Sequence, residues 1–168
     1  MSGRGTPALA ALAAGGTAHV VHEYEPPGPT GGRDREARPQ YGPDAAAALG
    51  VERDRVFKTL VVSVDGRLVV GVVPVSGELD LKALAAVAGG RRADLAPPEA
   101  AQRATGSVIG GISPLGHRRP MPIYVDASAS TFSTVFVSGG RRGLQVELAP
   151  GDLIRLTGAT TVRITRER

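Results

Sequence analysis

The sequence predicts a mixed α/β domain, because strand-like and helix-like segments alternate along the chain. Arg55–Val64 and Arg67–Val75 are rich in β-branched residues and are joined by Asp65-Gly66, a dipeptide typical of tight hairpins. In Asp80–Ala88 the apolar residues recur at helical spacing, and a glycine follows as a stop signal. With 168 residues and no visible linker, we expect one domain spanning residues 1–168.

The N-terminal segment predicts a short helix followed by a strand. Thr6 can cap and Pro7 can start a helix that ends near Ala14, before two glycines. Thr17–Tyr24 is strand-like. We expect residues 1–5 to be disordered.

The rest of the chain is divided into short elements by glycine and proline. Pro26–Gly42 is rich in Gly, Pro and Arg, and is expected to form a long exposed loop. Helices are expected over Pro43–Leu49, Pro98–Ala104 and Pro150–Leu156, and strands over Pro122–Val125, Thr134–Ser138, Leu144–Leu148 and Thr160–Thr165.

Composition narrows the class of protein. The chain has no cysteine, which excludes a disulfide framework and a thiolate metal site. No apolar run is long enough to span a bilayer, so we expect a cytoplasmic protein without a membrane partner. His19 and His22 are three residues apart on a predicted strand and face opposite sides, so we expect neither a metal nor another cofactor.

Arginine supplies nearly all of the positive charge. The formal net charge is +4, and the arginines come in clusters such as Arg91-Arg92, Arg118-Arg119 and Arg141-Arg142, with others at Arg33, Arg35 and Arg38. These clusters are either a solvated surface or a face that meets a polyanion such as RNA. No aromatic-rich RNA-binding motif accompanies them, so a nucleic-acid contact would be made to the backbone.

The segment Thr105–Gly116, TGSVIGGISPLG, is the strongest local signal. Gly110 and Gly111 free the backbone to turn and permit close approach, and Pro114 fixes the exit. The segment is either a tight turn between strands or a loop that presents backbone N–H groups to a ligand.

Lys58 is the second signal. Strand alternation places it in one row with Val56, Leu60, Val62 and Val64, where an ammonium group is costly unless it is paired or reaches solvent. It is either an edge residue that extends outward or a functional group at the mouth of a pocket. No Ser/His/Asp set, nucleophile elbow or nucleotide-binding motif is recognisable.

Together these segments resemble the YbaK/EbsC family of aminoacyl-tRNA deacylases. The matching pieces occur in family order and cover nearly the whole chain: Thr6-Pro7-Ala8, Tyr24-Glu25, Val56–Leu60, Pro74–Lys82, Ala101–Gly106, Gly110–Gly116, Val137–Gly140 and Arg142–Leu144. The resemblance implies an α/β (α+β mixed) editing domain, similar to the one inserted in bacterial prolyl-tRNA synthetases. Its core would be a mostly antiparallel or mixed twisted sheet, or a partial barrel, flanked by helices.

The resemblance also implies a function and a site. The branch with GGISPLG is similar to enzymes that remove cysteine from Cys-tRNA(Pro), which implies charged tRNA as substrate and prolyl-tRNA synthetase as a possible partner. Lys58 would anchor the tRNA end, and Gly110, Gly111 and Ile112 would offer N–H groups to the ester carbonyl. The remaining substrate-binding positions implied are Tyr24, Tyr41, Thr59, Ser113, Pro114, Ser138 and Gly139.

The resemblance implies chemistry without a protein nucleophile. The cysteine thiol of the substrate would attack its own ester, giving a cyclic thioester and free tRNA, while the enzyme positions it. A positioned water that hydrolyses the ester is the alternative, since it would leave no motif in the sequence either. One departure is Gln145, which stands where the family often has an acidic residue. The alternatives are a deacylase for another small aminoacyl-tRNA, such as Ala-tRNA(Pro), and a non-catalytic module that binds tRNA or a synthetase.

Overall fold

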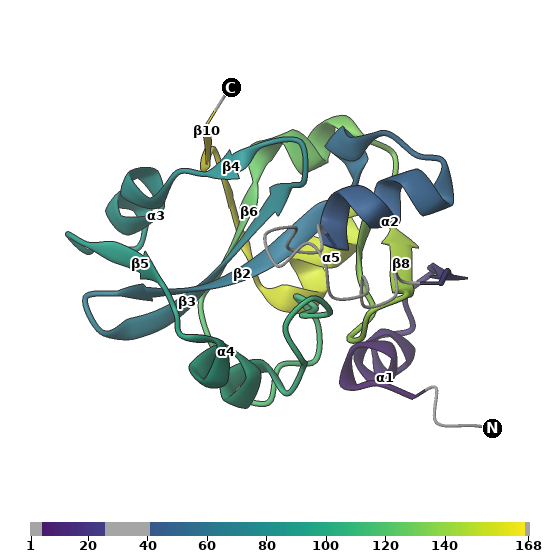
Figure 1. The fold of residues 1–168 in the computed structure, drawn as a ribbon, viewed down its shortest axis with the longest axis horizontal. Helices are drawn as coiled ribbons and strands as arrows, with labels where there is room; N and C mark the ends of the chain where they lie inside the picture. The colour runs from purple at the N-terminus through teal and green to yellow at the C-terminus, as the bar shows by residue number, and fades with distance from the viewer. Residues whose placement is uncertain (1–4, 26–40, 167–168) are drawn as a thin grey trace, which may run out of the picture.

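A long antiparallel hairpin lies at the centre of the computed structural model, which describes residues 5–25 and 41–166 (Figure 1). Strands β2 (Phe57–Val64) and β3 (Arg67–Pro74) pair over eight residues each. Asp65 and Gly66 connect them with φ values of 49° and 85°. Two successive positive φ values are those of a type I′ turn, so the predicted hairpin is confirmed.

The hairpin belongs to a mixed sheet of five strands in the order β5-β2-β3-β6-β9. Strands β5 (Ala93–Leu95), β2 and β3 are antiparallel neighbours, whereas β6 (Ile123–Asp126) and β9 (Thr160–Val162) add in parallel. A second, antiparallel sheet has the strand order β1-β8-β7. Its strands are β1 (Val20–Glu23), β7 (Val135–Ser138) and β8 (Leu144–Leu148). A parallel bridge between Val56 and Phe136 joins the two sheets. The predicted mixed sheet is therefore confirmed.

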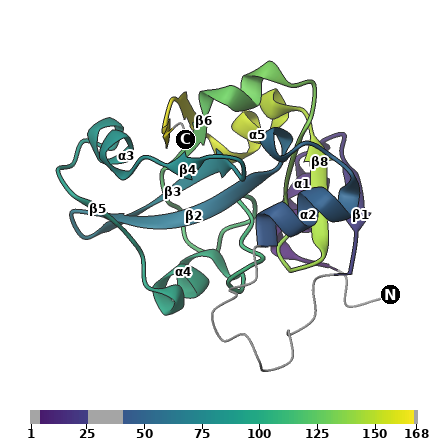
Figure 2. The same ribbon diagram turned by 45° about the horizontal axis from the view of Figure 1, so that its top comes forward.

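Helices cover both sheets. They are α1 (Pro7–Ala14), α2 (Tyr41–Leu49), α3 (Leu81–Val87), α4 (Pro98–Thr105) and α5 (Pro150–Thr157), with short 3₁₀ helices at Arg53–Arg55 and Ala127–Thr131. Thr6 caps α1 as predicted, since its Oγ1 accepts a hydrogen bond from the Leu9 N–H. Figure 2 shows α3 and α4 on opposite sides of the hairpin, and α2 beside β8. No helix in the described part of the chain is long and apolar enough to cross a membrane.

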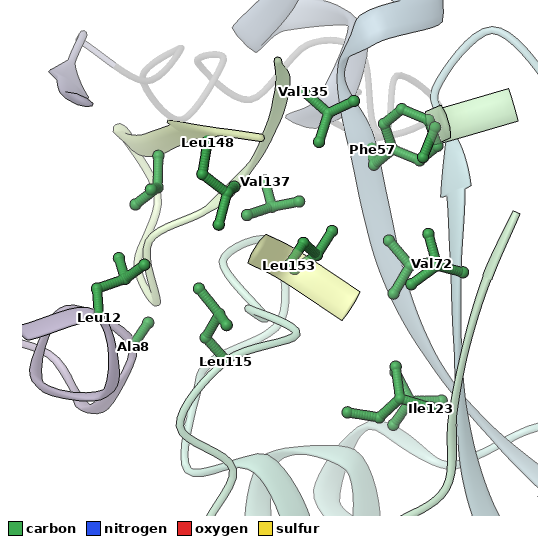
Figure 3. Close-up of a cluster of buried hydrophobic side chains, with 14 of the residues drawn as sticks. Ala8, Leu12, Phe57, Val72, Leu115, Ile123, Val135, Val137, Leu148 and Leu153 are labelled. Atoms are coloured by element: carbon green, nitrogen blue, oxygen red, sulfur yellow. The ribbon is translucent and has the colours of Figure 1, made fainter. Parts of the chain in front are cut away.

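The main core lies between the two sheets and is built from small and branched side chains. Figure 3 shows Leu153 of α5 between Val137 of one sheet and Val72 of the other. Leu12 of α1 and Leu115 are buried in the same cluster. Burial of this apolar surface holds the two sheets at a fixed separation.

Several predicted boundaries were wrong. Helix α2 begins at Tyr41, so the predicted loop Pro26–Gly42 extended two residues too far and the predicted helix began too late. The rest of that loop, residues 26–40, lies outside the described residues, and so do residues 1–4. The first strand is shorter than Thr17–Tyr24, because its pairing with β8 starts only at Val20.

The strand predicted over Thr160–Thr165 is divided into β9 and β10 (Thr165–Arg166), and β10 pairs with β4 (Glu78–Leu79). The division occurs where the buried Asp126 carboxylate accepts a hydrogen bond from the Ile164 N–H at 2.9 Å. Burial favours the neutral acid, but hydrogen bonds from Ser128 and the Ile164 N–H outweigh it and lower the pKa of Asp126. Asp126 therefore holds the C-terminal segment between two sheets.

The segment that the sequence singled out packs closely against the turn between β7 and β8. We call Val108–Gly116 the glycine loop and Gly139–Gly143 the β7–β8 turn. Ser138 Oγ donates to the Gly111 carbonyl at 2.8 Å and accepts from the Gly140 N–H at 3.1 Å. A Cβ atom at Gly111 would lie 2.7 Å from backbone atoms of Arg141, so only glycine fits there.

Replacing Gly111 with alanine tests this close approach. Because the neighbouring atoms are backbone, Gly111→Ala must displace the loop or the turn, and we expect a loss of about 1–3 kcal/mol of unfolding free energy. Gly151→Ala is the matched control, because nothing lies within 4 Å of its added Cβ atom. In a helix that change should leave stability unchanged or raise it by up to ~1 kcal/mol. Urea unfolding at 25 °C measures both, and equal stability of the two variants would contradict the packing argument.

Candidate functional site

A cavity of about 570 Å³ opens beside β2, within the range of roughly 300–1,000 Å³ that is usual for small-molecule sites. Its walls come from both sheets, the glycine loop and the start of α4. The lining residues are Tyr24, Arg53, Val56–Val61, Val75–Glu78, Leu95, Ala96, Ala101, Ile109, Gly110, Ile112, Ser138 and Gln145.

The cavity exists because one edge of β2 has no strand beside it along part of its length. At one end Val56 bridges to β7, and at the other Val62 begins the pairing with β5. The Val61 carbonyl accepts a hydrogen bond from the Ala96 N–H at 2.9 Å, on the side away from β3. Strand alternation then directs the backbone N–H and C=O of Thr59 to that same side, toward the cavity.

Lys58 lies in this stretch of β2 and lines the cavity. It is half-buried, between buried Phe57 and buried Thr59. Gly110 of the glycine loop lines the same cavity. The structure therefore places Lys58 and Gly110 around one space, although they are 52 positions apart in the sequence.

Of the three N–H groups that were expected to meet a ligand, those of Gly110, Gly111 and Ile112, the glycine loop uses one internally. The Gly111 N–H donates to the Val108 carbonyl at 3.0 Å, so it is not available to a ligand. The N–H groups of Gly110 and Ile112 donate to no acceptor within residues 5–25 and 41–166. Gly110 has φ +92°, a conformation that favours glycine. At most two of the three expected N–H donors, those of Gly110 and Ile112, are therefore available to a ligand.

The far side of the loop is anchored by buried polar groups. Ser113 is fully buried, and its Oγ accepts from the Leu115 N–H at 3.1 Å. The Ser113 carbonyl lies 2.7 Å from Nε2 of His117, which must therefore carry the hydrogen. Burial lowers the pKa of His117, which keeps the ring neutral near pH 7. These contacts fix the loop from behind the cavity wall.

The hydroxyl and amide groups at the cavity differ in how they are satisfied. Ser138 Oγ is occupied by the glycine loop and the β7–β8 turn. Thr59 Oγ1 and Gln145 Oε1 are buried and have no hydrogen-bond partner among the described residues. Among the described residues, no histidine lines the cavity that could act as a base for these hydroxyls.

Six of the residues proposed for the site line the cavity: Tyr24, Lys58, Thr59, Gly110, Ile112 and Ser138. Four do not: Gly111, Ser113, Pro114 and Gly139, which are buried in or behind the wall. The side chain of Tyr41 lies outside the described residues. Sequence reasoning missed Gln145 as a lining residue, although its departure from the family pattern marked the position.

The histidines that the sequence excluded as a metal pair serve other contacts. His22 Nε2 lies 2.9 Å from Glu147 Oε1, and the Nδ1 atom of His19 lies 2.7 Å from the Thr17 carbonyl. Hydrogen bonds from Thr134 and His22 lower the pKa of Glu147. Within the part of the chain that the structure describes, no three His, Asp or Glu side chains group closely enough to hold a metal ion.

Known proteins with similar sequences or folds point to tRNA editing. A protein of Enterococcus faecalis named "Putative Cys-tRNA(Pro)/Cys-tRNA(Cys) deacylase EbsC" is 40% identical over 121 residues, 71% of this chain and 74% of that one. A proline–tRNA ligase of Shouchella clausii is 32% identical over 126 residues, 74% of this chain but 22% of the ligase.

A solved structure, "Crystal structure of a putative trans-editing enzyme for prolyl tRNA synthetase", matches with a TM-score of 0.80 and 27% identity over 99% of both chains. The sequence model of the aminoacyl-tRNA editing domain matches residues 41–156, which include β2, the glycine loop and β8. The chain therefore belongs to the aminoacyl-tRNA editing domain family.

Proposed function

We propose that the protein is a trans-editing deacylase that releases cysteine from mischarged Cys-tRNA(Pro). The observation that carries the proposal is the shared cavity of Lys58 and the glycine loop. An aminoacyl-tRNA end brings an anionic phosphate backbone and an ester carbonyl into one small volume. A cation on one wall and N–H donors on the other suit those two groups.

Lys58 has the role of anchoring the tRNA end in this proposal. Its ammonium is a compact point charge that binds phosphate or ribose oxygens. The net charge of +4 favours association with the polyanion. Prolyl-tRNA synthetase is a partner in this account, since proline–tRNA ligases contain a segment similar to this chain.

The N–H groups of Gly110 and Ile112 stabilise the charge that develops on the ester carbonyl oxygen. They are attached to a loop that Ser138, Ser113 and the close approach at Gly111 hold in place. Donors that are fixed before the reaction need no reorganisation during it. The loop thus acts as an oxyanion site made of backbone alone.

The substrate supplies the nucleophile. The chain has no cysteine, and Ser138 Oγ is held by two hydrogen bonds. The cysteine sulfur of the substrate forms a bond to its own ester carbonyl carbon, and the bond from that carbon to the ribose oxygen breaks. The thiol proton ends on the ribose oxygen, which leaves free tRNA and a cyclic thioester.

Cysteine is the amino acid that fits this chemistry and this need. Proline and cysteine side chains are similar in size, and a pocket discriminates weakly between such groups. A second site that requires a thiol distinguishes them by reactivity, because proline has no group that can attack its ester.

Lys58→Ala tests the anchoring role. We expect kcat/KM for Cys-tRNA(Pro) to fall by about 10²-fold or more, since the positioned cation is lost. Deacylation of radiolabelled Cys-tRNA(Pro), with and without prolyl-tRNA synthetase, measures the effect.

Lys82→Ala is the matched control, because the other lysine of the chain is exposed on α3. It should keep full activity, and both variants should keep the wild-type circular dichroism spectrum. Wild-type activity in Lys58→Ala would remove the lysine from the mechanism.

A substrate panel tests the self-attack chemistry. Ser-tRNA(Pro) replaces the thiol with a far weaker nucleophile of similar size, so we expect it to react about 10²-fold or more slowly than Cys-tRNA(Pro). S-methylcysteinyl-tRNA(Pro), in which the thiol is blocked, should react as slowly. Comparable rates on all three would mean that water attacks the ester, and Ala-tRNA(Pro) would then be an equally good substrate.

A further inference from the structure

Two buried oxygen atoms in the cavity wall have no use in the mechanism described so far. They are Thr59 Oγ1 and Gln145 Oε1, which have no hydrogen-bond partner among the described residues. Both residues are 7% exposed, and both line the cavity. Buried polar atoms are nearly always satisfied, because an unpaired one costs free energy. Two unsatisfied buried oxygens in the wall of one cavity indicate that a ligand forms the missing hydrogen bonds.

The two atoms come from different sheets. Gln145 is in the central strand of the β1-β8-β7 sheet, where it pairs with Ser138 on one side and His22 on the other. Thr59 is in β2 of the five-stranded sheet, beside Lys58. Ser138, the strand neighbour of Gln145, already has its hydroxyl satisfied. The other two buried side-chain oxygens without a printed partner in the described chain, Ser128 Oγ and Thr165 Oγ1, lie away from the cavity. Their side chains act on the buried Asp126 carboxylate, which lowers its pKa, whereas no such group serves Thr59 Oγ1 or Gln145 Oε1.

The chemistry of these atoms selects a hydrogen-bond donor. An amide oxygen only accepts, and a threonine hydroxyl accepts as well as donates. The phosphate oxygens and the ester carbonyl of an aminoacyl-tRNA only accept hydrogen bonds, so they cannot donate one to Gln145 Oε1. The donors at this end of the substrate are the free ribose hydroxyl, the adenine amino group, the thiol and the α-ammonium group. The first two are neutral and the thiol is a weak donor, whereas the α-ammonium is charged and has three donors and no acceptor.

We propose that Thr59 and Gln145 bind the α-ammonium group of the aminoacyl ester. The inference rests on the proposed function, since it assigns part of the same cavity to a second group of the same substrate. It has a consequence for specificity. An ester whose amino group is acylated, as in peptidyl-tRNA, lacks the ammonium and adds bulk at the two oxygens, so the cavity excludes it.

Glu78 is the competing acceptor in the cavity. It is the one carboxylate among the lining residues of the described chain, and it is exposed. An ammonium bound at the mouth of the cavity would contact Glu78, whereas one bound at the buried wall would contact Gln145 and Thr59. Variants at the two places therefore separate the two positions.

Binding of a stable substrate analogue tests the inference. The probes are 3′-deoxy-3′-(L-cysteinylamino)adenosine and its N-acetyl derivative, titrated into the full chain by calorimetry. We expect the wild type to bind the free amine at least 10-fold more tightly than the acetylated form. In Gln145→Leu and Thr59→Val this preference should fall to within about 2-fold, and in the control Glu78→Gln it should persist.

Several results would overturn the inference. These are equal binding of both probes by the wild type, binding of neither probe, a preference that survives in both wall variants, or its loss in Glu78→Gln alone. The melting temperature gives a second readout. Removing unsatisfied buried oxygens should leave the melting temperature of the free protein unchanged or raise it, and a large decrease would show that these atoms serve the fold.

The two proposals fail separately in this experiment. Deacylation of Cys-tRNA(Pro) by the wild type tests the function, and the difference between the two analogues tests the ammonium contact. A wild type that releases cysteine but ignores N-acetylation keeps the function and contradicts the assignment of Gln145 and Thr59.

Discussion

The site depends on one close approach between two backbone segments. The glycine loop lies against the β7–β8 turn so tightly that a Cβ atom at Gly111 would lie 2.7 Å from the backbone of Arg141. Ser138 reinforces the contact through its hydrogen bond to the Gly111 carbonyl. Because this contact fixes the loop, the N–H groups of Gly110 and Ile112 remain directed by the fold and not by the ligand. The cavity is therefore organised before anything binds.

The opposite wall of the cavity is formed by β2, which pairs with different strands at its two ends. It bridges to β7 at Val56 and joins β5 only from Val62, which leaves an open edge between them. Lys58 and Thr59 occupy that gap. The cavity therefore contains different kinds of group together: the open edge of β2 supplies Lys58 and Thr59, the glycine loop supplies backbone N–H groups, and β8 of the other sheet supplies Gln145. In the mechanism we propose, such a site positions the substrate and does not need its own nucleophile.

The sequence predicted the strongest local features and missed those that depend on pairing. The hairpin at Asp65-Gly66 and the cap at Thr6 follow from short-range chemistry, and both were correct. Strand β5 was missed because three residues next to exposed arginines carry no strand pattern of their own. The division of the last strand was missed because it depends on Asp126, 38 positions away from Ile164.

The same limit applies to the site. Lys58 and the paired glycines stood out because each is unusual in its own segment, and the cavity brings Lys58 and Gly110 together. The use of the Gly111 N–H within the loop could not be read from residue types. Gln145 was recognised only as a mismatch to a family pattern, because its place in the cavity wall depends on the packing of two sheets.

The most direct measurement is an NMR titration of the ¹⁵N-labelled protein with 3′-deoxy-3′-(L-cysteinylamino)adenosine. The account predicts large shifts of the Gly110 and Ile112 N–H signals and smaller ones for Gly111, whose N–H is already bonded to Val108. Unchanged signals at Gly110 and Ile112 at saturation, with shifts clustered elsewhere on the protein, would contradict it.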